Sequence, residues 1–132
     1  MNASNIGLWI TGIILAFMGW IFLDMSAPST SAHTGTGSSL SEVRTSTLPV
    51  LVEFYADWCG PCKAVGPEVD KLATELTGKA KVLRINIDEQ PDAASAHGVR
   101  AVPTFIAFRS GRETSRKAGA IPRTQMKAML GL

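Results

Sequence analysis

The pattern of hydrophobic and polar positions divides the chain into three stretches. Residues 6–23 carry no charge and are nearly all apolar, whereas residues 24–39 are rich in Ser, Thr and Gly. After that, short apolar runs alternate with segments of helical periodicity. We therefore expect a short tail at residues 1–5, a membrane anchor at residues 6–23, a flexible tether at residues 24–39 and one folded domain at residues 40–132.

Within the folded domain, the pattern predicts strands and helices in alternation. The strand runs are residues 50–55, 82–87, 104–108 and 112–118, and the helical segments are residues 61–76, a short helix opened by Pro91, and Pro122 to Met129. The order β-α-β-α-β-β-α predicts an α/β domain whose central mixed sheet has helices on both faces. The first two strands should be parallel, and the last two should form a hairpin that turns at Ser110-Gly111.

The apolar run at residues 6–23 is long enough to cross a bilayer. As a helix it spans about 27 Å at roughly 1.5 Å per residue, close to the roughly 30 Å of a hydrocarbon core. Asp24 and the absence of basic residues until Arg44 slightly favour a cytoplasmic N-terminus, which predicts a single-pass membrane protein with an extracytoplasmic domain.

Two other interpretations of this run stay open. One is a buried helix of a soluble protein, and the other is a cleaved secretory signal with Thr30 and Ala32 before the cut. No Lys or Arg precedes the run, and it is longer than the roughly 7–15 apolar residues of a signal core. We therefore expect an uncleaved anchor.

Charge and cysteine content exclude several classes of function. The net charge is +2, from 13 Lys and Arg and 11 Asp and Glu, and basic residues are interspersed with acidic ones, which argues against a nucleic-acid surface. The two cysteines, Cys59 and Cys62, are too few for a disulfide framework, and a bond between them closes a very small loop. The pair therefore indicates chemistry rather than structural reinforcement.

The cysteines occur in Trp58-Cys59-Gly60-Pro61-Cys62, where the first predicted strand meets the first long helix. Cys59 should lie at the helix N-terminus, where unpaired N–H groups favour a thiolate, so it is the candidate nucleophile. Cys62 falls almost one turn later and is the candidate resolving cysteine. The alternative is half of a zinc site, but about four ligands are needed and only His33 and His97 are left over.

This motif, in its strand-to-helix context, resembles the active site of the thioredoxin family. The similarity runs from about Leu48 to the C-terminus, and it includes Ala56-Asp57, Pro67, Asn86-Ile87-Asp88, Val102-Pro103-Thr104 and Gly119-Ala120. It implies a thioredoxin-like fold and a thiol–disulfide oxidoreductase whose redox-active group is the Cys59–Cys62 disulfide, with no bound cofactor and no metal. It also implies that Val102-Pro103 is a cis peptide opposite the cysteines that aligns an extended client segment. The implied client-binding residues are Trp58, Gly60, Pro61, Val102, Pro103, Thr104 and Gly119.

Glu53 is where the sequence departs from the family pattern, since thioredoxins typically carry a buried Asp there that exchanges a proton with the resolving cysteine. Burial would raise the pKa of Glu53 and make it a usable base, although Glu is one methylene longer. Arg84 stands where Lys is common and Tyr55 where Trp is usual. The alternatives are that Glu53 is a structural carboxylate on a sheet edge and that Arg84 is a surface or ion-pair residue.

Together these features predict a membrane-tethered enzyme that reduces protein disulfides. Its partners would be protein disulfide substrates and an upstream reductant, either a thioredoxin reductase or a membrane electron carrier. Net disulfide oxidation or isomerisation is one alternative, although Gly60-Pro61 resembles reducing thioredoxins at about −270 mV rather than oxidants at about −120 mV. A non-catalytic module that holds a client beside Pro103 is the other, and the presence of both cysteines argues against it.

Overall fold

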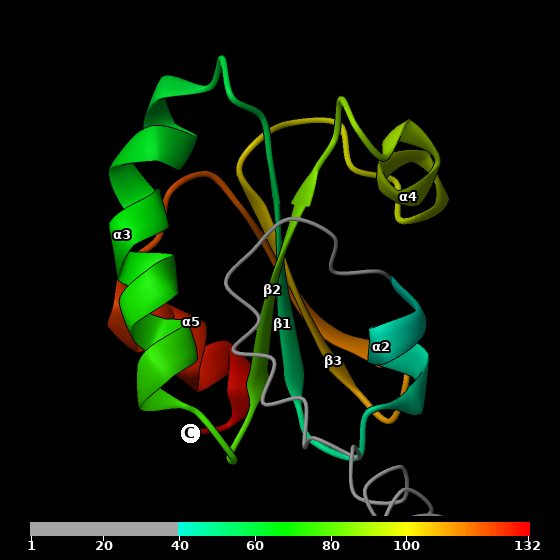
Figure 1. Ribbon diagram of the computed structural model, residues 1–132, viewed down its shortest axis with the longest axis vertical. Coiled ribbons are helices and arrows are strands. Elements are labelled where there is room, and N and C mark those ends of the chain that lie inside the picture. Colours follow the sequence, from blue (N-terminus) through cyan, green and yellow to red (C-terminus); the bar gives the residue numbers. More distant parts are fainter. Residues whose placement is uncertain (1–39) are drawn as a thin grey trace, which may run out of the picture. The chain divides into compact units, whose positions relative to one another are not determined.

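The computed structural model describes residues 40–132, and the predicted tail, anchor and tether lie outside this range. No helix within residues 40–132 is long and apolar enough to cross a membrane. Figure 1 shows the elements, which are α2 (Leu40–Thr45), β1 (Val50–Tyr55), α3 (Gly60–Glu75), β2 (Lys81–Asn86), α4 (Pro91–Ala96), β3 (Thr104–Arg109), β4 (Arg112–Ala118) and α5 (Arg123–Leu130).

The four strands form one mixed sheet in the order β2-β1-β3-β4. Strands β1 and β2 are parallel and joined by the α3 crossover, while β3 is antiparallel to both β1 and β4. The hairpin turns at Ser110 and Gly111, which both have a positive φ, as the two central residues of a tight hairpin turn require. Apart from α2, the predicted element order is confirmed, as are the mixed sheet and the hairpin.

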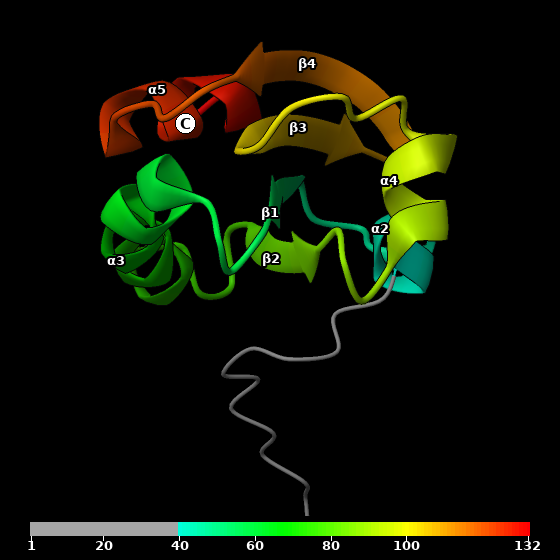
Figure 2. The same ribbon diagram turned by 90° about the horizontal axis from the view of Figure 1, so that it is seen from above.

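Helices cover both faces of the sheet, as predicted. In Figure 2, α3 and α5 lie together on one side and α2 and α4 on the other. Alternation along β1 sends Leu51 into the α3/α5 core, while Val50, Val52 and Phe54 enter the α2/α4 core. The same alternation places Glu53 on the face that α3 covers.

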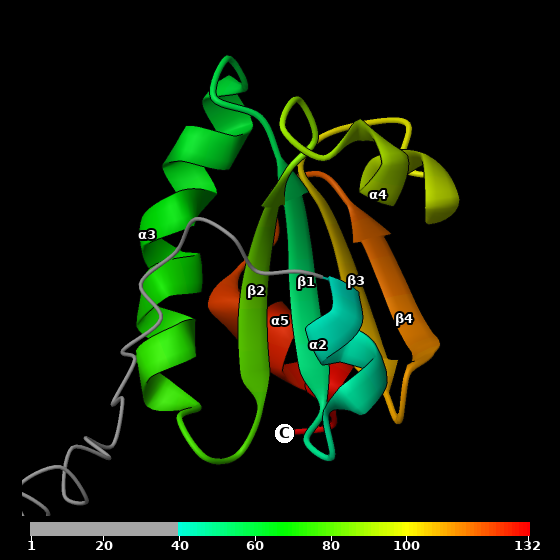
Figure 3. The same cartoon turned by 45° about the vertical axis from the view of Figure 1, so that its right-hand side comes forward.

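Helix α2 was not predicted from the sequence. It has only six residues, and Val43 is its one buried side chain, so it carries too little periodicity to be recognised. It lies on the same face of the sheet as α4, as Figure 3 shows. The other elements match the prediction within one or two residues. Helix α5 begins at Arg123 rather than at Pro122, which is its N-cap residue.

Candidate active site

Cys59 and Cys62 lie at the start of α3, next to the C-terminal end of β1. Cys59 is the N-cap residue, and its Sγ accepts a hydrogen bond from the backbone N–H of Cys62 at 3.2 Å. The two residues form a disulfide with their Cα atoms 5.3 Å apart, and both are buried. The predicted position of Cys59 at a helix N-terminus is confirmed, and these amides would stabilise a thiolate there once the disulfide is reduced.

The surroundings of the disulfide are apolar and include the loop before β3. Ala56 and the two cysteines form a small buried cluster, against which Val102 packs. Val102-Pro103 is a cis peptide bond, as the resemblance implied. The structure therefore brings Val102 to the cysteines from about forty residues away in the chain.

Hydrogen bonds hold the other residues of that loop in place. The Thr104 hydroxyl donates to the Ala101 carbonyl at 2.7 Å, and the Gly119 N–H donates to the Pro103 carbonyl at 2.8 Å. Gly119 directly follows β4, so the end of the hairpin is tied to the cis-proline loop. Pro103 and Thr104 are buried, whereas Gly119 is exposed.

Two side-chain hydrogen bonds tie the segment before the motif to the loop after β2. The Trp58 Nε1–H donates to Asp88 Oδ2 at 2.9 Å, and Asn86 Nδ2 donates to Asp57 Oδ2 at 3.2 Å. Asn86 Oδ1 in turn accepts the Asp88 N–H at 3.0 Å. The Trp58 side chain is still 68 % exposed, so a large apolar surface lies beside the disulfide. No role for Asn86 or Asp88 could be predicted from the sequence.

Glu53 is fully buried on an interior strand, because β1 pairs with β2 on one side and β3 on the other. The alternative of a carboxylate on a sheet edge is therefore wrong. Glu53 Oε2 accepts a hydrogen bond from Arg84 Nε at 2.6 Å, while Oε1 is buried with no hydrogen-bond partner. Burial raises the pKa of Glu53, and the adjacent Arg84 cation offsets only part of that rise. Asp70 raises the pKa further.

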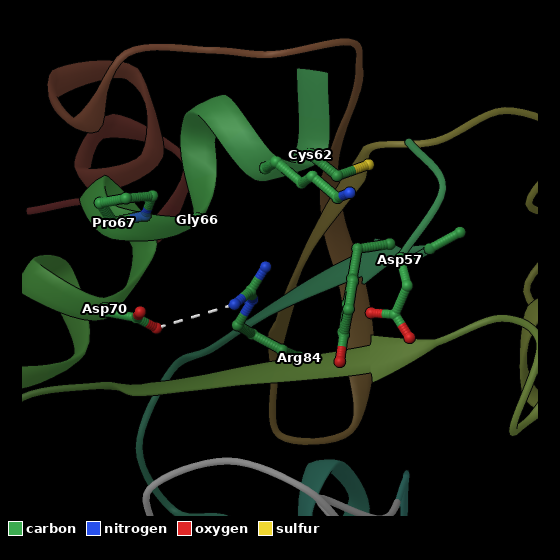
Figure 4. Close-up of a pocket in the computed structure, with 9 residues that line it drawn as sticks. Asp57, Cys62, Gly66, Pro67, Asp70 and Arg84 are labelled. Carbon is green, nitrogen blue, oxygen red and sulfur yellow. Dashed lines mark ion pairs between the residues drawn. The ribbon is translucent and has the colours of Figure 1, made fainter. Parts of the chain in front are cut away.

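Arg84 connects Glu53 to the cysteine site. Its side chain is 28 % exposed, and its guanidinium carbon lies 4.4 Å from the centroid of the Tyr55 ring, in cation–π contact. It also lies 3.9 Å from an Asp70 carboxylate oxygen. Figure 4 shows Arg84 and Cys62 among the residues that line one open pocket of about 320 Å³. The interpretation of Arg84 as an ion-pair residue is confirmed, whereas the roles of Asp70 and Gly66 beside it were not foreseen.

The fold and the motif together define a thioredoxin-like disulfide oxidoreductase. A family model described as Thioredoxin matches residues 34–131. The chain is 41 % identical to thioredoxin 1 of Nostoc sp. over 102 residues, which cover 77 % of this chain and 95 % of that protein. It is 49 % identical to thioredoxin 1 of Chlorobaculum tepidum over 85 residues, covering 64 % of this chain and 84 % of the relative.

The chain is also similar to solved structures of thioredoxins. A mutant thioredoxin from Halobacterium salinarum matches with a TM-score of 0.64 and 36 % identity, over 73 % of this chain and 83 % of that one. Fasciola hepatica thioredoxin matches with a TM-score of 0.61 and 30 % identity, over 70 % and 85 %. The chain belongs to the thioredoxin family. It is a disulfide reductase of the thioredoxin type, whose redox-active group is its own cysteine pair.

Proposed function

We propose that this protein is a membrane-tethered reductase of protein disulfides in which Cys59 attacks and Cys62 resolves. The observation that carries the assignment is the position of Cys59 Sγ, at the N-terminus of α3 and within hydrogen-bond distance of a helix amide. That environment favours the thiolate, which is the nucleophilic form. Gly60-Pro61 between the cysteines supports net reduction rather than oxidation.

The reaction consists of two exchange steps. The Cys59 thiolate attacks one sulfur of the client disulfide, and the other client sulfur leaves as a thiolate that takes up a proton. Cys62 then loses its proton and attacks Cys59 Sγ, which breaks the mixed disulfide and releases the second client thiolate. Two electrons pass from the cysteine pair to the client, and the Cys59–Cys62 disulfide remains.

Glu53 is the proposed base for the second step. It lies on the face of the sheet covered by α3, which carries Cys62, and burial raises its pKa toward the range in which a carboxyl can exchange protons near neutrality. Its neighbour Arg84 lines the same pocket as Cys62. These observations support a proton route between β1 and the start of α3.

The proposed client site surrounds the disulfide. Trp58, Gly60 and Pro61, beside the cysteines in the chain, are exposed, and Val102 packs against the cysteine cluster. An extended client segment would lie along the loop that Pro103, Thr104 and Gly119 hold in place.

Membrane attachment rests on the sequence alone. The uncharged run of residues 6–23 would anchor the chain, and the tether would hold the domain roughly 20 Å from the bilayer on average, using about 5–6 Å times the square root of its length. The electron donor must lie on the same side of the membrane as the domain. An extracytoplasmic domain would receive electrons from a membrane electron carrier, whereas a cytoplasmic domain would receive them from a thioredoxin reductase.

The reduction potential of the Cys59/Cys62 couple tests the proposed direction of electron flow. Equilibration with dithiol redox buffers, followed by alkylation and mass measurement, should give a value near the roughly −270 mV of thioredoxin. A value near the roughly −120 mV of a strong oxidant would support net disulfide formation instead. Labelling of intact and permeabilised cells with a membrane-impermeant thiol reagent shows the side of the membrane on which the pair lies.

A further inference from the structure

Gly66 lies buried in the middle of α3, directly before Pro67. Glycine is a poor residue for a helix interior because it has the most conformational freedom to lose. A Cβ at this position would lie 3.3 Å from Nη2 and 3.6 Å from Nη1 of Arg84. An added Cβ would therefore press against the guanidinium, which would have to yield by a few tenths of an ångström.

The guanidinium in this space is held from several directions. Its Nε–H donates to Glu53, the Tyr55 ring lies against it, and Asp70 of α3 lies 3.9 Å from Nη1. Figure 4 shows Arg84 reaching from β2 toward Gly66 and Asp70 on α3. A guanidinium pushed by an added Cβ would disturb these contacts, including the hydrogen bond to Glu53.

We propose that Gly66 is a positioning residue for the second exchange step: it admits the Arg84 guanidinium between β2 and α3, and Arg84 keeps Glu53 as the carboxylate that accepts the Cys62 proton. This inference rests on the proposed function and adds the device that controls its base. Arginine does not lose its proton in proteins, so the positive charge of Arg84 beside Glu53 is present at every pH of the experiment.

The step is balanced in protons and electrons. In the mixed disulfide, the Cys62 thiol transfers its proton to the Glu53 carboxylate and the Cys62 thiolate attacks Cys59 Sγ. The client sulfur leaves as a thiolate and is protonated, and the protonated Glu53 then returns its proton to solvent. Because only the carboxylate form of Glu53 can act, the rate of this step should fall on the acidic side of the pKa of Glu53.

Several charged or titratable groups surround this carboxyl. Arg84 of β2 is hydrogen-bonded to it and lowers its pKa, whereas the negative charge of Asp70 of α3 raises that pKa. Tyr55 lies two residues further along β1. Lys63 and Asp57 line the pocket that Arg84 shares with Cys62. Among these groups Arg84 is the cation in direct contact with Glu53, so displacing it should raise the pKa of Glu53.

The primary test is Gly66→Ala in the full chain, with stopped-flow mixing of the reduced protein and a client disulfide. The two exchange steps are followed separately, as release of the first and of the second client thiol. An opposite charge in contact lowers a carboxyl pKa by roughly 1–3 units. A shift of a few tenths of an ångström weakens the contact of Arg84 with Glu53 without removing it, so Gly66→Ala should move the acidic limb of the pH profile to higher pH by less than about one unit. On that limb, the rate should fall by less than about tenfold at a given pH. The pH profile of the first step, formation of the mixed disulfide, serves as the internal reference and should not move in parallel.

A double-mutant cycle separates this effect from a general disturbance of α3. Arg84→Met removes the cation with little change in side-chain length. It should move the acidic limb of the pH profile to higher pH at least as far as Gly66→Ala does. Adding Gly66→Ala to Arg84→Met should then move the limb no further. Gly66→Ala combined with Arg84→Lys should recover part of the shift, because a slimmer cation fits beside the added Cβ.

The outcomes are distinct from those that test the proposed function. If the wild-type protein does not reduce the disulfide of a protein client, the proposed function is wrong. If it does reduce that disulfide and Arg84→Met leaves the acidic limb in place, or Gly66→Ala shifts the limb equally with and without Arg84, the proposed role of Gly66 is wrong. Arg84→Met changes a partly exposed side chain, so the test does not depend on the folding of the Gly66 variant.

Discussion

Replacing Glu53 by Gln should change how the stability of the protein depends on pH. Glu53 is fully buried, and burial raises its pKa above the ordinary value of 4.5 despite the ion pair with Arg84. The folded protein therefore holds the proton more tightly than the unfolded chain does. Glutamine has nearly the same shape as the protonated acid but does not titrate, so it serves as a permanent reference for that form.

The sign and the size follow from proton linkage. With a raised pKa in the folded state, the contribution of Glu53 to stability is fully present below about pH 4.5 and is lost as the pH rises through the pKa of the folded protein. In that window the free energy of unfolding of the wild type should fall, relative to Glu53→Gln, by up to about 1.4 kcal/mol per pH unit. The variant should therefore be the more stable protein at neutral pH, although it lacks the proposed base and should resolve mixed disulfides more slowly.

Urea unfolding of the oxidised proteins, followed by tryptophan fluorescence from pH 4 to pH 8, measures this difference. Glu75→Gln is a matched control, because a hydrogen bond from Lys127 lowers the pKa of Glu75. Its contribution is present above the unfolded pKa and lost as the pH falls, so that variant should be the less stable one at neutral pH and should approach the wild type in acid. A difference curve for Glu53→Gln that is flat, or that has the same sign as the control, would refute the reasoning.

Three other predictions concern the anchor, the core and the loop after β2. Deleting residues 1–25 should release a soluble domain with unchanged reductase activity, whereas the full chain should sediment with membranes; a mature native protein that begins near His33 would instead identify a cleaved signal. Leu72→Ala should lower the free energy of unfolding by about 2–5 kcal/mol in denaturant melts, because Leu72 is fully buried in the α3/α5 core, and a loss below about 1 kcal/mol would contradict that packing. Asn86→Ala should cost about 1–3 kcal/mol in the same melts, because it removes the hydrogen bonds to Asp57 and Asp88. An unchanged midpoint for Asn86→Ala would show that these bonds are replaced by water.

Much of the fold could be predicted from the sequence because its elements are long or strongly patterned. The buried run at residues 50–55, the helical spacing after Pro61 and the Ser110-Gly111 turn each point to one local structure. Helix α2 could not be predicted, since one buried valine in six residues does not make a period.

The cysteine site could be predicted because its residues are adjacent in the chain, whereas the Glu53–Arg84 pair could not. That pair depends on the register of β1 against β2, which places Glu53 beside Arg84. Strand register is set by packing and by the crossover, and it cannot be read from either strand alone. The contact between Arg84 and Gly66 requires in addition the position of α3 over the sheet, so Gly66 carried no recognisable signal.

The most direct test of the central claim is to identify the cysteine that holds the client. The Cys62→Ser variant, incubated with a protein disulfide such as that of insulin and analysed by non-reducing peptide mass spectrometry, should accumulate a mixed disulfide through Cys59. The Cys59→Ser variant should neither reduce the client nor accumulate such a species. Normal turnover by Cys62→Ser, or efficient reduction by Cys59→Ser, would contradict the assignment of Cys59 as the nucleophile and Cys62 as the resolving cysteine.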